Sequence, residues 1–192
     1  MPSPVGHAVA GLIVALALER RIPAGKKGAG GAGSTTPATY APTDLRTRAL
    51  FLVCMFLAAL PDIDYLYPPI HRGPTHSMGA TVIVMLAAAG VTWWTTGRIR
   101  WPLAIVCGLA HFSHVVMDWL GEDPTATPGV MALWPLSDRL FISGSGLFRS
   151  TWRINPLAPA NLAHNLRTLA QEMILLGPIL FWLLWRRGRT RA

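Results

Sequence analysis

Apolar residues along this chain gather into five blocks, and polar or turn-forming residues separate each block from the next. Five such segments leave little polar surface to cover them, which is typical of helices that pack within a membrane. The third and fourth blocks approach the roughly 20 residues that cross a bilayer as a helix, whereas the first two are shorter. The pattern predicts an all-α, polytopic membrane bundle of about five helices, at residues 4–18, 49–60, 78–96, 101–120 and about 166–185. The alternative is a soluble helical protein with very apolar core helices.

Composition favours the membrane interpretation, because 52% of the residues are hydrophobic and only 14% are charged. The net charge of +8 would also suit a nucleic-acid-binding protein, but the 17 basic residues form no single patch and lie where apolar blocks end. We therefore interpret them as determinants of membrane topology and expect no nucleic-acid partner. Cys54 and Cys107 lie inside apolar blocks, which predicts buried thiols rather than a disulfide.

Two longer polar segments interrupt the blocks, within what the length predicts to be a single domain, 1–192. Residues 22–45 are rich in Gly, Ala, Pro and Thr and predict a flexible cytosolic loop. Their "GAGGAGST" lacks the lysine of a phosphate-binding loop, and no strand precedes it, so we reject that motif. Residues 121–163 predict an extracytoplasmic loop or a lid over a site. Trp134 and Trp152 are expected to anchor this loop at the headgroup level.

The basic residues also predict an orientation. If the five blocks cross the membrane in turn, twelve basic residues fall on one side and five on the other. The positive-inside rule places the twelve in the cytoplasm, so the N-terminus faces outward and the C-terminus inward. All six histidines, together with Asp62, Asp64 and Asp118, then lie at the outer face.

Histidine and aspartate at one face suggest a metal site, because neutral imidazole and carboxylate are the usual ligands of zinc and of other hydrolytic divalent metals. His114 and Asp118 are four residues apart and share one helix face, with His111 one turn deeper on the same stripe. In "PDID", the proline ends the preceding helix and leaves Asp62 and Asp64 in an extended or turn-like segment.

The segment "HRGPTHS" predicts a turn at its Gly-Pro pair, after which Thr75 caps the third helix and His76 lies in its first turn. Taken alone, each candidate has a simpler explanation as an interfacial histidine or a solvated aspartate. Together, three carboxylates beside apolar helices would repel one another and lose hydration, and one or two divalent cations would remove that cost. The predicted ligands are His7, Asp62, Asp64, His71, His76, His114 and Asp118, with His111 and His164 left open as ligands or bystanders.

The strings "LPDIDY", "HRGPTHS", "HFSHVVMDW" and "LWPL", in this order, resemble the LexA-binding, inner-membrane-associated hydrolases. These are bacterial and archaeal membrane proteins described as metal-dependent hydrolases. The resemblance covers most of the chain apart from the Gly-rich loop and much of 136–163, and "HRGPTHS" is its most specific part. It implies a place in the cytoplasmic (inner) membrane of a prokaryote and a hydrolytic activity. The family label also suggests contact with a cytosolic DNA-repair repressor.

A more distant similarity is to the zinc-dependent phospholipase C and single-strand nuclease group, which are helical proteins whose multi-zinc site cleaves phosphodiesters. It rests on the step from Asp62 to His76 followed by the helical pair His114 and Asp118, so it is an analogy. The further HxxxE element of that group is absent, and Glu172 can substitute for its acid. A carboxylate inside a membrane helix is a functional candidate, and the alternatives here are an ion pair with Arg167 or a buried hydrogen bond.

These features predict a membrane-bound, metal-dependent hydrolase that cleaves a phosphoester of a lipid or lipid-linked substrate with metal-activated water. The cofactor would be one or two zinc ions, with manganese or iron as alternatives. The expected catalytic residues are Asp64 as a metal bridge or base, Arg72 as a phosphate or headgroup ligand, and Glu172. Expected partners are membrane lipids and an amphiphilic substrate. The alternatives are an ion or metal transporter and a membrane adaptor without catalysis.

Overall fold

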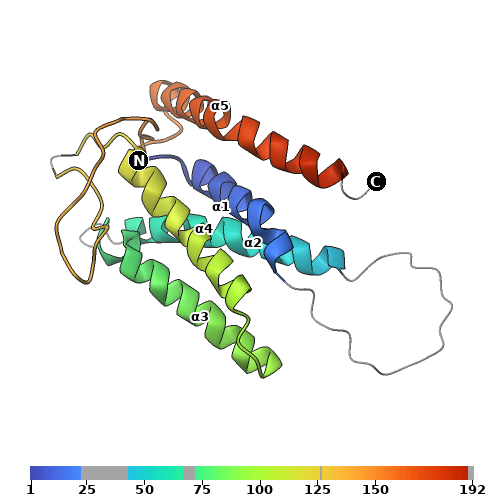
Figure 1. Cartoon of the computed structure of the whole chain (residues 1–192). Helices are drawn as coiled ribbons and strands as arrows, with labels where there is room; N and C mark the ends of the chain where they lie inside the picture. The colour runs from blue at the N-terminus through green and yellow to red at the C-terminus, as the bar shows by residue number, and fades with distance from the viewer. Residues whose placement is uncertain (23–42, 67–71, 126, 190–192) are drawn as a thin grey trace, which may run out of the picture.

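Five helices make up most of the structure, which is a computed structural model that describes residues 1–22, 43–66, 72–125 and 127–189 (Figure 1). The bounds of the helices are α1 Pro4–Leu18, α2 Thr43–Ala59, α3 Met78–Thr96, α4 Trp101–Leu120 and α5 Pro159–Arg189. Short 3₁₀ helices follow α1 and α2 and precede α3, at η1 Glu19–Arg21, η2 Leu60–Leu66 and η4 Pro74–His76. Within the described residues two isolated β-bridges occur and no strand does. The predicted all-α fold is confirmed.

Helices α1, α3 and α4 begin and end where the apolar blocks predict, because local chemistry marks their ends. The side chain of Ser3 accepts a hydrogen bond from the Gly6 amide at the start of α1. Ser77 makes the same bond with the Ala80 amide at the start of α3. Gly97, with a φ of 68°, ends α3 in the left-handed conformation that glycine adopts without a steric cost.

The start of α3 corrects one prediction. Ser77, not Thr75, caps α3, and His76 belongs to the preceding η4 turn rather than to the first turn of α3. Thr75 instead donates a hydrogen bond from its hydroxyl to Oδ2 of Asp64, at 2.5 Å. The local sequence allows either hydroxyl to cap the helix, and the contact with Asp64 decides between them.

Helix α5 begins at Pro159 rather than near residue 166, so the predicted loop 121–163 ends at residue 158. Its first turns are polar, which is why the apolar pattern misses them. The polar stripe nevertheless faces the protein: His164 and Thr168 lie against the carbonyl oxygen of Ser150, and Glu172 contacts Ser3. A helix can therefore extend beyond its apolar block when its polar side chains find buried partners.

Helix α4 lies in the middle of the bundle, where it contacts α1, α2 and α3, while α5 packs on α1 (Figure 1). Small residues let these helices approach closely, and the buried contact includes Ala15, Cys54, Val106 and Ala110. Gly11 of α1 faces α2 so closely that a Cβ there would lie 2.3 Å from the carbonyl oxygen of Cys54.

The outside of the bundle is apolar. Helices α3, α4 and α5 are long and apolar enough to cross a membrane, and in α3 only 11% of the most apolar window is buried within the protein. Large side chains such as Ile83, Trp94, Ile174 and Phe181 are exposed. An apolar helix surface of this extent suits contact with lipid rather than with water. Helices α1 and α2, at 15 and 17 residues, are shorter than a typical span.

Segments that are distant in sequence meet at one end of the bundle, which carries the N-terminus, η2, η4 and the loop 121–158 (Figure 1). Backbone hydrogen bonds tie this loop to the helices. The Gly79 amide donates to the carbonyl of Trp134, and the Thr151 amide donates to the carbonyl of Met1. The loop is therefore attached at several points rather than hinged as a free lid. Arginines such as Arg21, Arg98 and Arg187 lie at or beyond the opposite helix ends, and the membrane orientation that they predict stays a prediction.

The close approach at Gly11 gives a test of the packing. We expect Gly11→Ala to lower the free energy of unfolding by about 1–3 kcal/mol, because the added methyl forces α1 away from α2. Gly90→Ala in α3 is the matched control, since nothing lies within 4 Å of a Cβ at Gly90. Alanine there should leave stability unchanged or raise it. Thermal unfolding in detergent measures both, and equal effects of the two substitutions would contradict the α1–α2 contact.

Candidate metal centre

The candidate metal centre is built on Asp118, which α4 places one turn beyond His114. Both side chains are fully buried, and Nε2 of His114 lies 3.1 Å from Oδ2 of Asp118. The other ring nitrogen of His114, Nδ1, lies 2.7 Å from the carbonyl oxygen of Ala58 in α2. A carbonyl only accepts, so Nδ1 carries the proton and donates. Nε2 is then the nitrogen with a lone pair, as in histidines that bind metals.

Helix α1 brings His7 to the same carboxylate. Nε2 of His7 lies 3.3 Å from Oδ1 of Asp118, and the His7 side chain is fully buried. The His7 ring stacks on the His114 ring with their centroids 3.7 Å apart. His7, His114 and Asp118 each offer one ligand atom, and these atoms all lie within 4.8 Å of one another.

The η4 turn adds His76 on another side of Asp118. Nε2 of His76 lies 3.4 Å from Oδ2 of Asp118, while Nδ1 lies 3.2 Å from Oδ2 of Asp64. Asp64 thus contacts the His76 nitrogen that points away from Asp118. A carboxylate in this position orients the imidazole and fixes its tautomer. Burial lowers the pKa of His76 below its ordinary value of 6.5, which keeps the ring neutral near pH 7.

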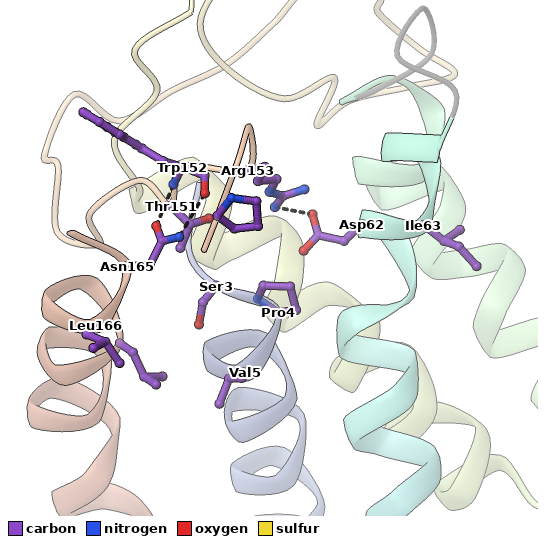
Figure 2. Close-up of a pocket in the computed structure, with 12 residues that line it drawn as sticks. Ser3, Pro4, Val5, Asp62, Ile63, Thr151, Trp152, Arg153, Asn165 and Leu166 are labelled. Carbon is purple, nitrogen blue, oxygen red and sulfur yellow. Dashed lines mark hydrogen bonds and ion pairs between the residues drawn. The ribbon is translucent and has the colours of Figure 1, made fainter. Parts of the chain in front are cut away.

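A second group of possible ligands consists of Asp62, His76 and His114, whose ligand atoms also lie within 4.8 Å of one another. Asp62 is in η2, and its Oδ1 accepts a hydrogen bond from Nη2 of Arg153 at 2.8 Å (Figure 2). His114 belongs to both groups, yet its Nδ1 is engaged by Ala58. Only Nε2 of His114 therefore has a lone pair for a metal, and one lone pair binds one ion. The two groups cannot both hold a metal ion through His114 at the same time.

The buried polar atoms of the centre fit a cation. Nε2 of His7, Nε2 of His114 and both carboxylate oxygens of Asp118 are buried without a hydrogen-bond partner. Such atoms are costly to bury, and in a neutral His114 that donates through Nδ1 the lone pair on Nε2 faces a carboxylate oxygen. A divalent cation would satisfy them all, since imidazole and carboxylate are ligands of zinc. Proton sharing between His114 and Asp118 alone would leave His7 unsatisfied.

The comparison of the whole chain with protein families decides its family. Residues 1–190 match the YdjM inner membrane protein family. The chain belongs to this family. Neither the curated proteins nor the solved structures gave a match. Membership in an inner-membrane family agrees with the three helices of membrane-spanning length and identifies a membrane protein.

Other predicted site residues of this YdjM-family chain lie away from the two ligand groups. Glu172 is buried beside the start of α1, where its carboxylate accepts bonds from the amide and the hydroxyl of Ser3. Gly6 leaves room for it, because a Cβ there would lie 2.5 Å from Oε2 of Glu172. Glu172 is thus positioned to stabilise the N-terminus of α1, which is the buried hydrogen bond left open above.

The remaining candidates have partners of their own. Nδ1 of His111 lies 3.0 Å from the hydroxyl of Thr81. Nε2 of His164 lies 2.8 Å from the carbonyl of Ser150. Neither histidine is in a ligand group. His71 lies outside the described residues.

Arg72 holds the loop 121–158 instead of reaching the ligand groups. Its guanidinium binds the carboxylate of Asp123 and donates to the hydroxyl of Thr125 at 2.8 Å. Burial by itself would raise the pKa of Asp123, but the bond from Arg72, with those from Gly129 and Thr125, outweighs it and holds the pKa below its ordinary value. Arg72 adopts a φ of 65°, a left-handed backbone conformation that is uncommon for residues other than glycine. The ion pair between Arg72 and Asp123 also stabilises this conformation.

Sequence reasoning missed Arg153 and the carbonyl of Ala58. Arg153 lies in a loop without a recognisable motif. Every residue has a backbone carbonyl, so the sequence does not show which carbonyl will contact a histidine. A weak signal existed for Arg153, because it is one of the five basic residues that the charge pattern predicts on the same side as the histidines.

The Arg72–Asp123 pair predicts a pH dependence of the loop. The folded pKa of Asp123 is lower than its ordinary value of 3.8, so the contact stabilises the loop above that value. The stabilisation is lost as the pH falls through the folded pKa. We expect hydrogen exchange at the Gly129 amide, which donates to Asp123 at 2.7 Å, to be slow at pH 6 and faster, relative to its intrinsic rate, near pH 3. Asp123→Asn should exchange fast at both, and a protection factor of the native protein that does not change with pH would contradict this assignment.

Proposed function

We propose that this chain is a membrane-embedded, metal-dependent hydrolase that cleaves a phosphoester of a lipid or lipid-linked substrate. The observation that carries the proposal is the group of buried, unpartnered ligand atoms on His7, His114 and Asp118. Burying a carboxylate between apolar helices is costly unless a cation or a proton compensates it. Three separate helical segments, α1, η4 and α4, deliver histidines to this one carboxylate.

His7, His114 and Asp118 would hold the ion, with His76 beside them, and zinc suits this donor set best. A divalent cation lowers the pKa of water and so supplies a hydroxide nucleophile near neutral pH. Manganese and iron are alternatives with the same donor atoms. The sharing of His114 between the two groups favours one ion at a time over two.

The other acids and bases then take supporting roles. Asp64 positions His76 through Nδ1, and Thr75 in turn donates to Asp64. Asp62 belongs to the second ligand group and also lines the cavity in Figure 2. A carboxylate there can act as a base and accept the proton that attacking water releases. Arg153, which bonds to Asp62, supplies positive charge next to a phosphoryl group. Arg72 and Glu172 support the loop and α1 rather than the reaction.

Metal content tests the proposal first. We expect the tag-free protein, purified in detergent without chelator, to hold about one equivalent of zinc, manganese or iron by inductively coupled plasma mass spectrometry. Asp118→Asn and His114→Gln should lose it. His164→Gln is the matched control, because this histidine lies outside both ligand groups, and it should keep the metal. Equal metal content in all four proteins would show that the metal binds elsewhere.

Asp64→Asn separates positioning from ligation. Because Asp64 contacts His76 and belongs to neither ligand group, we expect metal affinity to fall by about 10–100-fold rather than to vanish. Competition with a fluorescent zinc chelator measures the change. An affinity equal to that of the native protein would remove Asp64 from the centre.

Activity is tested on phosphatidic acid, phosphatidylcholine and polyprenyl phosphates, with release of phosphate or of the phosphorylated head as the readout. Hydrolysis that is lost in Asp118→Asn and retained in Arg149→Gln, at an exposed arginine outside the cavity lining, would support the enzyme. Metal binding without hydrolysis of any of them, together with metal uptake into vesicles, would instead support a carrier.

A further inference from the structure

A cavity of about 570 Å³ opens beside the candidate metal centre, between α1, η2, the loop segment 151–156 and the first part of α5 (Figure 2). This size is ordinary for a small-molecule site. The lining is largely apolar and includes Pro4, Val5, Ile63, Trp152, Leu166 and Leu169. Two charged residues also line it, Asp62 and Arg153, and Asp62 belongs to a ligand group of the centre.

Hydrogen bonds fix the walls of this cavity. Trp152 exchanges two of them with the side chain of Asn165 in α5, through its amide at 2.8 Å and its carbonyl at 2.9 Å. The Trp152 ring stacks on His164 with their centroids 4.8 Å apart. The neighbouring Thr151 amide donates to Met1 at 2.9 Å, next to the start of α1. The cavity is therefore formed before any ligand enters it.

The charged end of the cavity is an ion pair in which the cation, Arg153, is the more exposed partner. Arg153 donates to Oδ1 of Asp62, and its side chain is 19% exposed while that of Asp62 is 8% exposed. The guanidinium has five N–H donors in a planar fork, so it can bond a phosphate oxygen while keeping Asp62. The apolar end lies between α1 and α5, where exposed residues such as Val5 and Leu166 face out of the bundle. A ligand that matches both ends has an anionic head and an apolar chain.

We propose that this cavity binds one chain of a lipid with a phosphate head, that Arg153 selects the phosphate, and that Leu169 and its apolar neighbours hold the chain. The inference rests on the proposed function, since it names the substrate class of the same centre. It adds a place for the chain, and it makes Arg153 the residue that selects a phosphate head. The site faces the apolar exterior, so the ligand enters from the bilayer.

The test is binding without turnover. Chelator-treated protein in phosphatidylcholine nanodiscs is photolabelled with phosphatidic acid or with diacylglycerol, each carrying a diazirine in an acyl chain. We expect phosphatidic acid to label residues 151–169 with at least about tenfold higher affinity than diacylglycerol, because a charge-assisted bond is lost in the latter. Excess inorganic phosphate should not displace the lipid, since it lacks the chain.

Five variants locate the effect. Arg153→Gln should remove the preference for phosphatidic acid, and Arg153→Lys should keep part of it. Arg149→Gln, an exposed arginine in the same loop, should change nothing. Leu169→Trp fills the cavity and should reduce labelling by both lipids, whereas Leu162→Trp, on α5 outside the cavity, should not. Folding of each variant is checked by its thermal unfolding in detergent.

The outcomes separate the two proposals. Selective labelling with no hydrolysis of any lipid leaves the binding site standing and overturns the enzyme. If the native protein hydrolyses lipid but well-folded Arg153→Gln keeps the full preference for phosphatidic acid, only the role of Arg153 is overturned. Labelling that maps away from the cavity lining in α1, η2 and residues 151–169, or that inorganic phosphate displaces as well as lipid does, overturns the chain site.

Discussion

The Asp118 carboxylate imposes the constraint on which the rest of the structure depends. It is buried at one end of an apolar bundle, and histidines from α1, η4 and α4 lie within 3.1–3.4 Å of its two oxygens. A charge in this position needs compensation, because burial removes its hydration. Neutral imidazoles bring no net positive charge, whereas a divalent cation shared by these atoms does. The arrangement of the helices can be understood as the means of bringing the histidines to that point.

Each element around Asp118 contributes to this placement. α4 contacts three other helices, and small residues in α1, α2 and α4 let the backbones approach. The end of α2 contributes the Ala58 carbonyl that orients His114. Glu172 stabilises the start of α1, which is the helix that carries His7. The loop 121–158, held by Arg72 and Asp123, covers the same end of the bundle and brings Arg153 to Asp62.

The sequence was sufficient for the parts of this account that depend on periodicity. The apolar blocks predict α1, α3 and α4 to the residue, and helical spacing predicts that His114 and Asp118 share a face. The sequence also predicts that His7, His76 and His114 lie near one another, but not that His76 contacts Asp64 or that His114 contacts the Ala58 carbonyl. The polar start of α5 was missed because its side chains find buried partners that only the tertiary structure supplies. Likewise, Asp62 and Asp64 look equivalent in "PDID", yet Asp64 contacts His76 and Asp62 bonds to Arg153. The two aspartates are two residues apart in the 3₁₀ helix η2, which has three residues per turn, so their side chains face different sides.

The central claim is that a divalent metal is bound by His7, His114 and Asp118, and X-ray absorption at the zinc edge tests it most directly. On tag-free, zinc-loaded protein we predict a nitrogen and oxygen shell at about 2.0–2.1 Å with the multiple-scattering signature of imidazole. His7→Gln should weaken the imidazole signature, and His164→Gln should leave it unchanged. A spectrum without imidazole scattering, or one that is identical in the native protein and in His7→Gln, would contradict the account.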